Sequence, residues 1–173
     1  GAFENGETVT DGSASFTLAD IGNPVNAVAE IDGVWTGADT SDVTIDDWTT
    51  GVNNIIRIYT TDLARHKGKW DESKYRIEST DSLFVVQEKN VIIDGLQMDI
   101  LGESSGRRAV IYGVSSHGDE SKQIVSNNII RISNPNSNTI GVYASNLSTK
   151  SDYYFFNNIL YGGFLYGIRF DVP

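Results

Sequence analysis

The sequence predicts an all-β chain, folded as a right-handed parallel β-helix of about four to five coils with an N-terminal cap or arm. Three observations carry this prediction. Apolar residues do not recur every three to four positions over any long window, which disfavours helices. β-Branched and aromatic residues stand in short runs, as in strands. Two sets of apolar segments recur at a shared period, as in a coiled ladder.

The predicted strands are short and close together along the chain. They cover Ser15 to Leu18, Ala27 to Ile31, Asp42 to Ile45, Ile55 to Tyr59, Tyr75 to Glu78, Leu83 to Gln87, Val91 to Ile93, Ala109 to Val114, Gln123 to Ser126, Ile129 to Ile132, Ile140 to Ala144, Tyr153 to Phe156, Ile159 to Tyr161 and Tyr166 to Asp171.

Three segments with a turn at their centre form the first predicted ladder. They are Val91-Ile92-Ile93-Asp94-Gly95-Leu96, Ile124-Val125-Ser126-Asn127-Asn128-Ile129 and Tyr154-Phe155-Phe156-Asn157-Asn158-Ile159, and their turn pairs lie 33 and then 30 residues apart. Gly and Asn tolerate a left-handed backbone, so we expect the chain to bend at each pair without reversing. A hairpin at Asp94-Gly95 is the alternative, which recurrence at coil spacing disfavours.

A second predicted ladder runs beside the first. Its segments, spaced by 26, 31 and 26 residues, are Phe84-Val85-Val86, Val110-Ile111-Tyr112, Gly141-Val142-Tyr143 and Gly167-Ile168-Arg169. Side chains alternate between the faces of a strand, so one column is expected in the core and its neighbours outside. The core column is Val85, Ile111, Val142 and Ile168. The outward columns are Val86, Tyr112, Tyr143 and Arg169, and then Glu88, Val114, Ser145 and Asp171.

The stretch from Val91 to Asp171 resembles the right-handed parallel β-helix repeats of the pectate-lyase-like superfamily, through its strand, Asp-Gly or Asn-Asn corner, apolar strand and variable loop. Upstream, the segments Val43 to Thr50, Asn54 to Thr60, Arg65 to Trp70 and Tyr75 to Glu78 resemble the first coils of environmental and phage-associated β-helix proteins. The resemblance covers about residues 26–173 and implies the fold but no particular activity. It implies an extracellular or virion-surface location.

The repeat divides the chain into two parts. Residues 1–38 do not match it and are expected to form an acidic N-terminal cap or arm, while residues 39–173 form the β-helix. The sequence stops at Phe170-Asp171-Val172-Pro173, just after a strand, so an open coil end is expected there. Open coil ends present unpaired strand edges, which predicts self-assembly or contact with other protein chains.

Charge and composition exclude several partners. The formal net charge is −10, and residues 1–50 hold ten acids and no Lys or Arg, so no basic face for nucleic acid is expected. No segment approaches the roughly 18 apolar residues of a membrane span, so no membrane partner is expected. The chain has no Cys, which excludes disulfides and thiolate metal sites.

One outward face of the predicted helix carries aromatic and charged residues. Tyr112, Tyr143, Arg169 and Asp171 are the candidate glycan-binding residues. Sugar faces pack on aromatic rings, while hydroxyl or carboxylate groups pair with charged side chains. Ordinary solvent-facing ladder residues are the alternative interpretation.

No cofactor or metal is predicted, with Ca²⁺ kept as the alternative. Asp39, Asp42, Asp46 and Asp47 offer the oxygen ligands that Ca²⁺ prefers. Their spacing is not that of an EF-hand loop, so they are expected to be solvated turn acids. His66 and His117 stand in polar loops and are expected on the surface, as is Trp70.

These patterns predict a non-catalytic structural or adhesive β-helix module of an extracellular, filament, phage or virion-surface protein, with glycan binding as an added activity. The alternative is a polysaccharide lyase or hydrolase acting on acidic glycans. Hydrolases need paired carboxylates, and only Asp171 and Glu88 share a predicted column. No lyase motif is present, so no catalytic residue is assigned.

Overall fold

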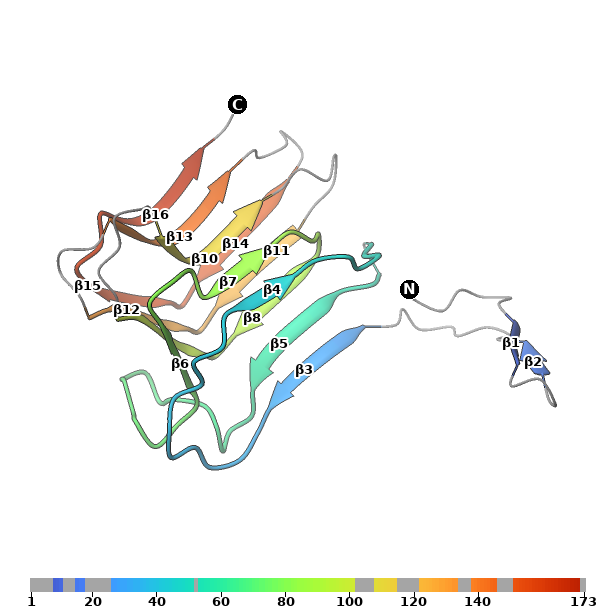
Figure 1. The fold of residues 1–173 in the computed structure, drawn as a ribbon, viewed down its shortest axis with the longest axis horizontal. Coiled ribbons are helices and arrows are strands. Elements are labelled where there is room, and N and C mark those ends of the chain that lie inside the picture. The colour runs from blue at the N-terminus through green and yellow to red at the C-terminus, as the bar shows by residue number, and fades with distance from the viewer. Residues whose placement is uncertain are drawn as a thin grey trace.

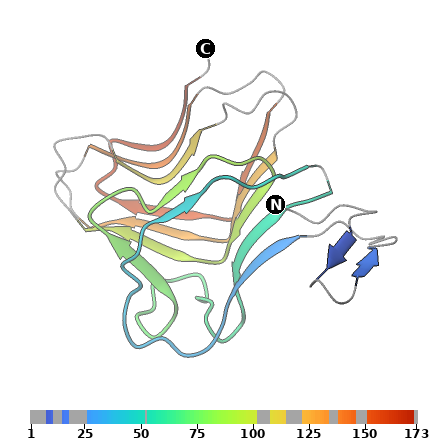
Figure 2. The same ribbon diagram turned by 45° about the vertical axis from the view of Figure 1, so that its right-hand side comes forward.

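Three parallel sheets wind around one apolar core in the computed structural model of the chain (Figure 1, Figure 2). The described residues are 8–10, 15–17, 26–51, 53–101, 108–114, 122–133, 138–145 and 151–171. Within these ranges all regular structure is β, and the sheets stack as a parallel β-solenoid of about four turns. The predicted fold class is therefore confirmed.

Each coil of the solenoid contributes one strand to each sheet. Sheet I contains β3 (Ala27–Ile31), β5 (Ile56–Thr60), β8 (Val91–Asp94), β11 (Lys122–Ser126) and β14 (Asp152–Phe156). Sheet II contains β6 (Arg76–Ser79), β9 (Gln97–Ile100), β12 (Ile129–Ile132) and β15 (Ile159–Gly162). Sheet III contains β4 (Val43–Ile45), β7 (Phe84–Val86), β10 (Arg108–Val114), β13 (Thr139–Ser145) and β16 (Tyr166–Asp171).

The first coil, β3 and β4, is incomplete. Where a strand of sheet II would lie, only an isolated bridge joins Asp39 to Ile77. β3 pairs in parallel with β5, so the ladder includes residues 27–31, which the sequence analysis assigned to the arm. The second coil is β5 to β7, the third β8 to β10, the fourth β11 to β13 and the last β14 to β16.

The core consists of inward columns that run from coil to coil. Ile77, Met98 and Ile130 stack in register on sheet II, and all three are fully buried. Ile58, Ile93 and Val125 form the corresponding column on sheet I. β-Branched side chains suit such stacking because their restricted rotamers pack against the next coil.

The first predicted ladder is present, but its register was wrong by one residue in the third coil. Asp94 pairs with Ser126, not with Asn127. The left-handed corner residue is Gly95 in the third coil, Asn127 in the fourth and Asn157 in the last, with φ of 81°, 56° and 54°. Apolar residues occupy successive positions of these strands, so their pattern did not specify the register.

The second ladder also differs from its predicted register at β7. Ile111 pairs with Phe84, and Tyr112 with Val85. Phe84 and Val86 are therefore the core residues, each 1% exposed, and Val85 faces outward. A shift of one residue turns a side chain to the opposite face. Because Phe84, Val85 and Val86 are all apolar, the sequence does not show which of them face the core.

Asparagine side chains join the third, fourth and last coils next to the left-handed corner. The fully buried Asn128 accepts the Leu96 N–H at 2.9 Å through Oδ1, and its Nδ2 donates to Ile93 O at 3.1 Å. Nδ2 also donates to Oδ1 of Asn158 in the last coil, at 3.0 Å. The amide thus satisfies backbone groups that the bend leaves without a ladder partner.

Half of the predicted N-terminal arm, residues 1–38, falls within the described residues. β1 (Thr8–Thr10) and β2 (Ser15–Thr17) pair antiparallel as a hairpin. Residues 1–7, 11–14 and 18–25 lie outside the described ranges, so the expected cap is not tested. The described residues contain no helix long and apolar enough to cross a membrane.

Candidate functional site

The structure brings three of the predicted glycan-binding residues into one column on the outer face of sheet III. Tyr143 lies in register with Tyr112 on one side and with Arg169 on the other. Tyr143 and Arg169 are partly exposed, whereas Val142 and Ala144 beside Tyr143 are buried at 5% and 1% exposure. The side chain of Tyr112 lies outside the described part of the structure.

Asp171 joins this column through hydrogen bonds. Arg169 donates to both carboxylate oxygens of Asp171, from Nε at 2.8 Å and from a terminal nitrogen at 3.0 Å. The Tyr143 hydroxyl donates to the same carboxylate at 2.9 Å. The Asp171 carboxylate raises the pKa of Arg169, so the guanidinium stays charged at any ordinary pH. The cluster presents a fork of donors, a carboxylate and a ring within one patch.

Tyr166 is a member of this cluster that the sequence analysis did not assign. Its ring centroid lies 5.3 Å from the Arg169 guanidinium carbon, and the Tyr143 centroid lies 5.8 Å from it. Strict alternation places Tyr166 on the same face as Ile168, in the core. Both residues are exposed, because β16 is the last strand of the sheet: Tyr166 by 46% and Ile168 by 39%.

The predicted column of Asp171 and Glu88 is wrong. Asp171 stands in register with Ser145, which pairs with Val114 of β10. Glu88 follows β7 and is 6% exposed, and its Oε1 accepts the Trp48 N–H at 2.8 Å. Gly113 of β10 pairs with Val86, so Val114 lies opposite Gln87 and not Glu88, and the two carboxylates do not stand in one column.

The N-terminal acids are held separately by local hydrogen bonds. Asp39 accepts the Ser41 N–H at 3.0 Å and the Tyr75 hydroxyl at 3.3 Å. Asp46 accepts the N–H of Asp47 at 2.9 Å, and Asp47 has a left-handed φ of 62°. Among the described residues, no group of three or more acids or histidines is arranged to hold a metal ion.

Residues 61–75, between β5 and β6, form a loop that we call the strap. It lies along the corner between sheets I and II and contacts two further coils. Arg65 pairs with Asp94, whose carboxylate also accepts Ser126 Oγ at 2.9 Å and Asn127 Nδ2 at 2.5 Å. The backbone of the strap at Asp71 exchanges two hydrogen bonds with the Gln97 amide, at 2.7 and 2.9 Å.

His66 and Trp70 are packed into the strap and not fully exposed, which corrects the expectation for both. His66 Nε2 lies 2.9 Å from Asn127 O, and its Nδ1 accepts the Gly68 N–H at 3.1 Å. Because the carbonyl accepts only, this arrangement fits the neutral Nε2–H tautomer, and burial lowers the pKa of His66. The Trp70 ring lies 3.6 Å from the guanidinium carbon of Arg131.

Arg131 in turn pairs with a fully buried carboxylate. Its Nε lies 2.7 Å from Asp99 Oδ2, and Asp99 is 0% exposed. Ser133 adds hydrogen bonds to the same carboxylate from its N–H at 3.0 Å and its hydroxyl at 2.6 Å. The partners of Asp99 are complete, so we assign this group to structure and not to ligand binding.

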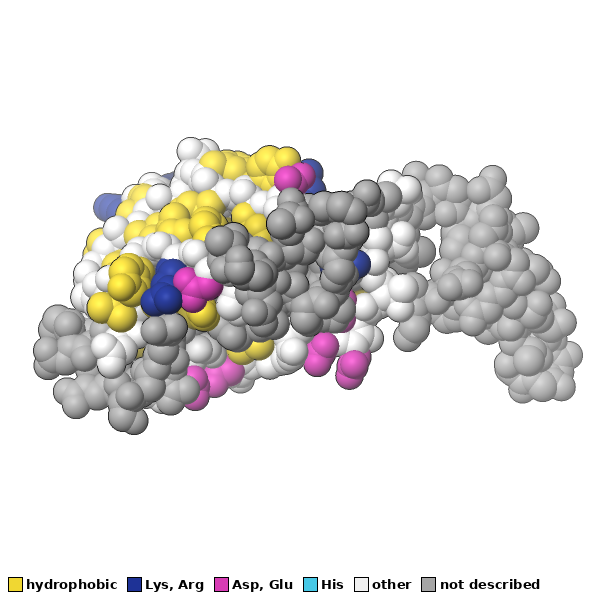
Figure 3. Space-filling model, turned by 90° about the horizontal axis from the view of Figure 1, so that it is seen from above, with side chains coloured by type: hydrophobic (Ala, Val, Ile, Leu, Met, Phe, Trp, Pro, Cys, Tyr) yellow, Lys and Arg dark blue, Asp and Glu magenta, His cyan; other side chains and the backbone are white. Residues whose placement is uncertain are grey.

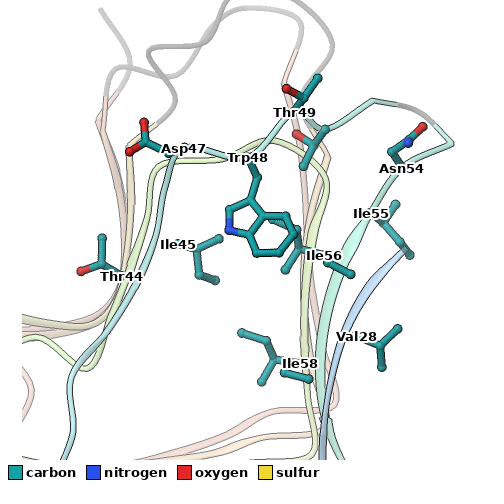
Figure 4. A pocket seen from close by; sticks show the side chains of 13 residues that line it. Val28, Thr44, Ile45, Asp47, Trp48, Thr49, Asn54, Ile55, Ile56 and Ile58 are labelled. Atoms are coloured by element: carbon teal, nitrogen blue, oxygen red, sulfur yellow. The ribbon is translucent and has the colours of Figure 1, made fainter. Parts of the chain in front are cut away.

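A hollow of about 760 Å³ opens at the first coil, between sheets I and III (Figure 4). Ile45 of β4 and Ile56 and Ile58 of β5 form its walls, and the Trp48 indole lies between the two sheets at its mouth. Ala27 and Ala29 of β3 also line it. β3 lies at the edge of sheet I, and the short side chains of Ala27 and Ala29 leave space beside Ile56 and Ile58.

Comparison of the chain with protein-family models, curated proteins and solved structures gives no match.

Proposed function

We propose that the chain is a non-catalytic structural module of an extracellular, filament, phage or virion-surface protein, which extends its ladder by stacking on a second copy. The observation that carries this proposal is the complementary shape of its first and last coils. Ala27 and Ala29 line a hollow at one end, and Tyr153 and Phe155 stand in the same columns at the other.

Two inward columns of sheet I begin with an alanine in the first coil and end with an aromatic residue in the last. One begins at Ala29 of the first coil and ends at Phe155 of the last. Its neighbour begins at Ala27 and ends at Tyr153, whose ring lies 5.6 Å from that of Phe170. Stacked head to tail, the aromatic residues of one copy would fill the 760 Å³ hollow of the next.

The exposed surface of the last coil supports the same arrangement. It carries large apolar side chains that are 39% to 50% exposed. These are Tyr154, Phe156, Ile159, Tyr161, Leu165, Tyr166, Ile168 and Phe170. Hydrophobic side chains gather on the face seen from above, with charged groups beside them (Figure 3). An apolar area of this kind favours contact with another protein surface.

The strand edges provide the backbone partners for such a contact. Among the described residues, β14 and β16 are paired on one side only, as are β3 and β4. Stacking would pair β14 with β3 and β16 with β4 of the next copy, in the order that the sheets already follow. The exposed backbone groups of each edge would then be satisfied.

Sedimentation velocity over a range of protein concentrations tests this proposal. We expect species larger than the monomer to increase with concentration, and Ala29→Trp to abolish them because the indole occupies the hollow. Val34→Trp is the matched control, since Val34 is 79% exposed and does not line the hollow. A strict monomer at every concentration, or equal effects of both variants, would contradict stacking.

Glycan binding on the outer face of sheet III is a second candidate function, favoured by the cluster of Tyr143, Arg169 and Asp171. The partly exposed Tyr143 ring and the Arg169–Asp171 ion pair beside it suit the apolar and polar faces of a sugar. The column with Tyr112 repeats at about 4.8 Å, the spacing of neighbouring strands, so that successive units of a polymer lying along the axis would meet successive coils.

Isothermal titration with a panel of acidic and neutral oligosaccharides tests this candidate. We expect saturable binding without product formation, weakened about tenfold by Tyr143→Ala, since ring contacts of this kind contribute about 1 kcal/mol or more. Unsaturated or shortened products that disappear in Arg169→Ala would favour the lyase or hydrolase alternative. The absence of binding to any glycan would refute a glycan role for this face.

A further inference from the structure

The strap covers the corner of the third and fourth coils but not that of the last coil. In the outward column of sheet II, Gln97 and Ile129 are fully buried, whereas Ile159, the next residue in register, is 41% exposed. Gln97 is hydrogen-bonded to the strap at Asp71 and Tyr75. The surface is therefore recessed at the last coil, next to the edge of the strap.

This recess is a groove of about 640 Å³, which we call the strap groove. The strap residues from Arg65 to Gly68 line one side, and the corner residues Asn127, Asn157, Asn158 and Ile159 line the other. Its volume lies within the usual range of about 300 to 1,000 Å³ for small-molecule sites. It is separate from the Tyr143 cluster, which lies on sheet III.

The charge of the strap groove differs from that of the rest of the chain. Residues 65–69 are Arg-His-Lys-Gly-Lys, three cations without an acid, in a chain of net charge −10. Arg65 is engaged with Asp94 and His66 with Asn127. Lys67 is exposed and pairs with no carboxylate among the described residues. One cation in the groove is thus available for an anionic ligand.

The opposite side of the groove offers hydrogen bonds and an apolar surface. Asn157 is exposed, and its Nδ2 makes a single long bond of 3.3 Å to Asn127 Oδ1, which leaves its second amide hydrogen for a ligand. Ile159 presents an aliphatic surface beside it. A ligand that matches all three elements has an anionic group, hydroxyls and an apolar face.

We propose that the strap groove binds an anionic sugar unit. The ammonium of Lys67 pairs with the carboxylate or sulfate, the Asn157 amide bonds to hydroxyls, and Ile159 packs against the apolar face of the ring. This inference does not rest on stacking or on the sheet III face: Lys67 and Asn157 belong to neither, and only Ile159 is shared with the exposed apolar surface of the last coil.

Isothermal titration of the full chain with three tetrasaccharides of equal length, a uronate, a sulfated and a neutral one, tests the proposal. We expect binding of at least one anionic tetrasaccharide, weakened by raising NaCl from about 50 to about 500 mM, and no binding of the neutral one. Binding of the uronate alone assigns the carboxylate, and binding of the sulfated sugar alone assigns the sulfate. Failure of both anionic sugars, or equal binding of the neutral one, overturns the proposal.

Two variants locate the ligand in this groove. Lys67→Gln is expected to weaken binding about tenfold, the effect of losing one charge-assisted contact. Lys69→Gln is the matched control, because Lys69 is exposed on the same strap but does not line the groove, and we expect less than about a twofold change. Asn157→Gly suits the left-handed backbone at φ 54° and removes the side chain with its amide, so it should weaken binding while the corner stays folded.

Binding that survives Lys67→Gln but is lost in Arg169→Ala would place the sugar on sheet III and overturn this assignment. Binding lost in Lys67→Gln and retained in Arg169→Ala supports it, whatever the oligomeric state of the chain.

Discussion

Gly95 and Gly68 form a matched pair for measuring how closely the strap packs on the corner. Both have a left-handed backbone, with φ of 81° and 79°. A side chain at Gly95 would overlap the guanidinium of Arg65, whereas nothing lies within 4 Å of the corresponding position at Gly68. Substitution by Ala therefore imposes the same backbone strain at both positions but a clash at only one.

We expect Gly68→Ala to lower the free energy of unfolding by about 1 kcal/mol, the usual effect of placing a residue with a side chain in this backbone region. Gly95→Ala should lower it by about 2 kcal/mol. The additional loss arises because Arg65 must move and release Asp94. The side chains of Arg65 and Asp94 are 29% and 10% exposed, so solvent screens their ion pair. Its loss is expected to lower the free energy of unfolding by about 1 kcal/mol.

Urea unfolding followed by circular dichroism measures both variants, with the m-value checked for constancy. The Arg65→Ala background supplies the control, since without the guanidinium Gly95→Ala should cost no more than Gly68→Ala. If Gly95→Ala and Gly68→Ala differ by less than about 0.5 kcal/mol in the wild-type background, the close packing of Arg65 on the corner is refuted.

Three further predictions concern the core and the strap. Asn128→Ala should lower the free energy of unfolding by about 3 kcal/mol, because Leu96 N–H and Ile93 C=O lose their buried partner; the exposed Asn53→Ala should change it by less than about 0.5 kcal/mol in the same urea assay. Met98→Ala should cost about 3 kcal/mol through the cavity left at a 0% exposed position, and a cost below about 1 kcal/mol would contradict its tight packing. Burial lowers the pKa of His66, so the unfolded chain binds the proton first and stability should fall as the pH drops below about 6.5. The fall should be shallower in His66→Gln. Equal dependence of the free energy of unfolding on pH in the variant and the wild type would refute a contribution from His66.

A second loss of stability is expected at lower pH, when Asp94 becomes protonated. Burial alone would raise the pKa of Asp94, but hydrogen bonds from Asn127, Arg65 and Ser126 outweigh it and lower the pKa. A lowered carboxyl pKa stabilises the fold above the unfolded value of about 3.9, and this stabilisation is lost as the pH falls through the folded value. The two transitions are separable because His66→Gln removes only the first.

The strands and their coil-like recurrence were predictable from the sequence because runs of β-branched residues, ended by Gly or Asn, have a local physical cause. The predicted strand Ala27 to Ile31 matches β3, and the column Tyr112, Tyr143, Arg169 is confirmed. β9 was not among the predicted strands, since Gln97 and Asp99 interrupt its apolar pattern. Both polar residues are fully buried by partners distant in sequence.

The sequence by itself determined the type of structure and the corner residues, because these follow from backbone preferences within a few residues. The recurrence of the strand segments set the approximate number of coils. Only the tertiary structure decided the register, since an apolar run such as Phe84 to Val86 satisfies the core in two alignments that differ by one residue. The position of the strap on the third and fourth coils could not be predicted from the sequence either. Its contacts join Arg65 to Asp94 and His66 to Asn127, and no local pattern specifies which coil a polar loop will cover.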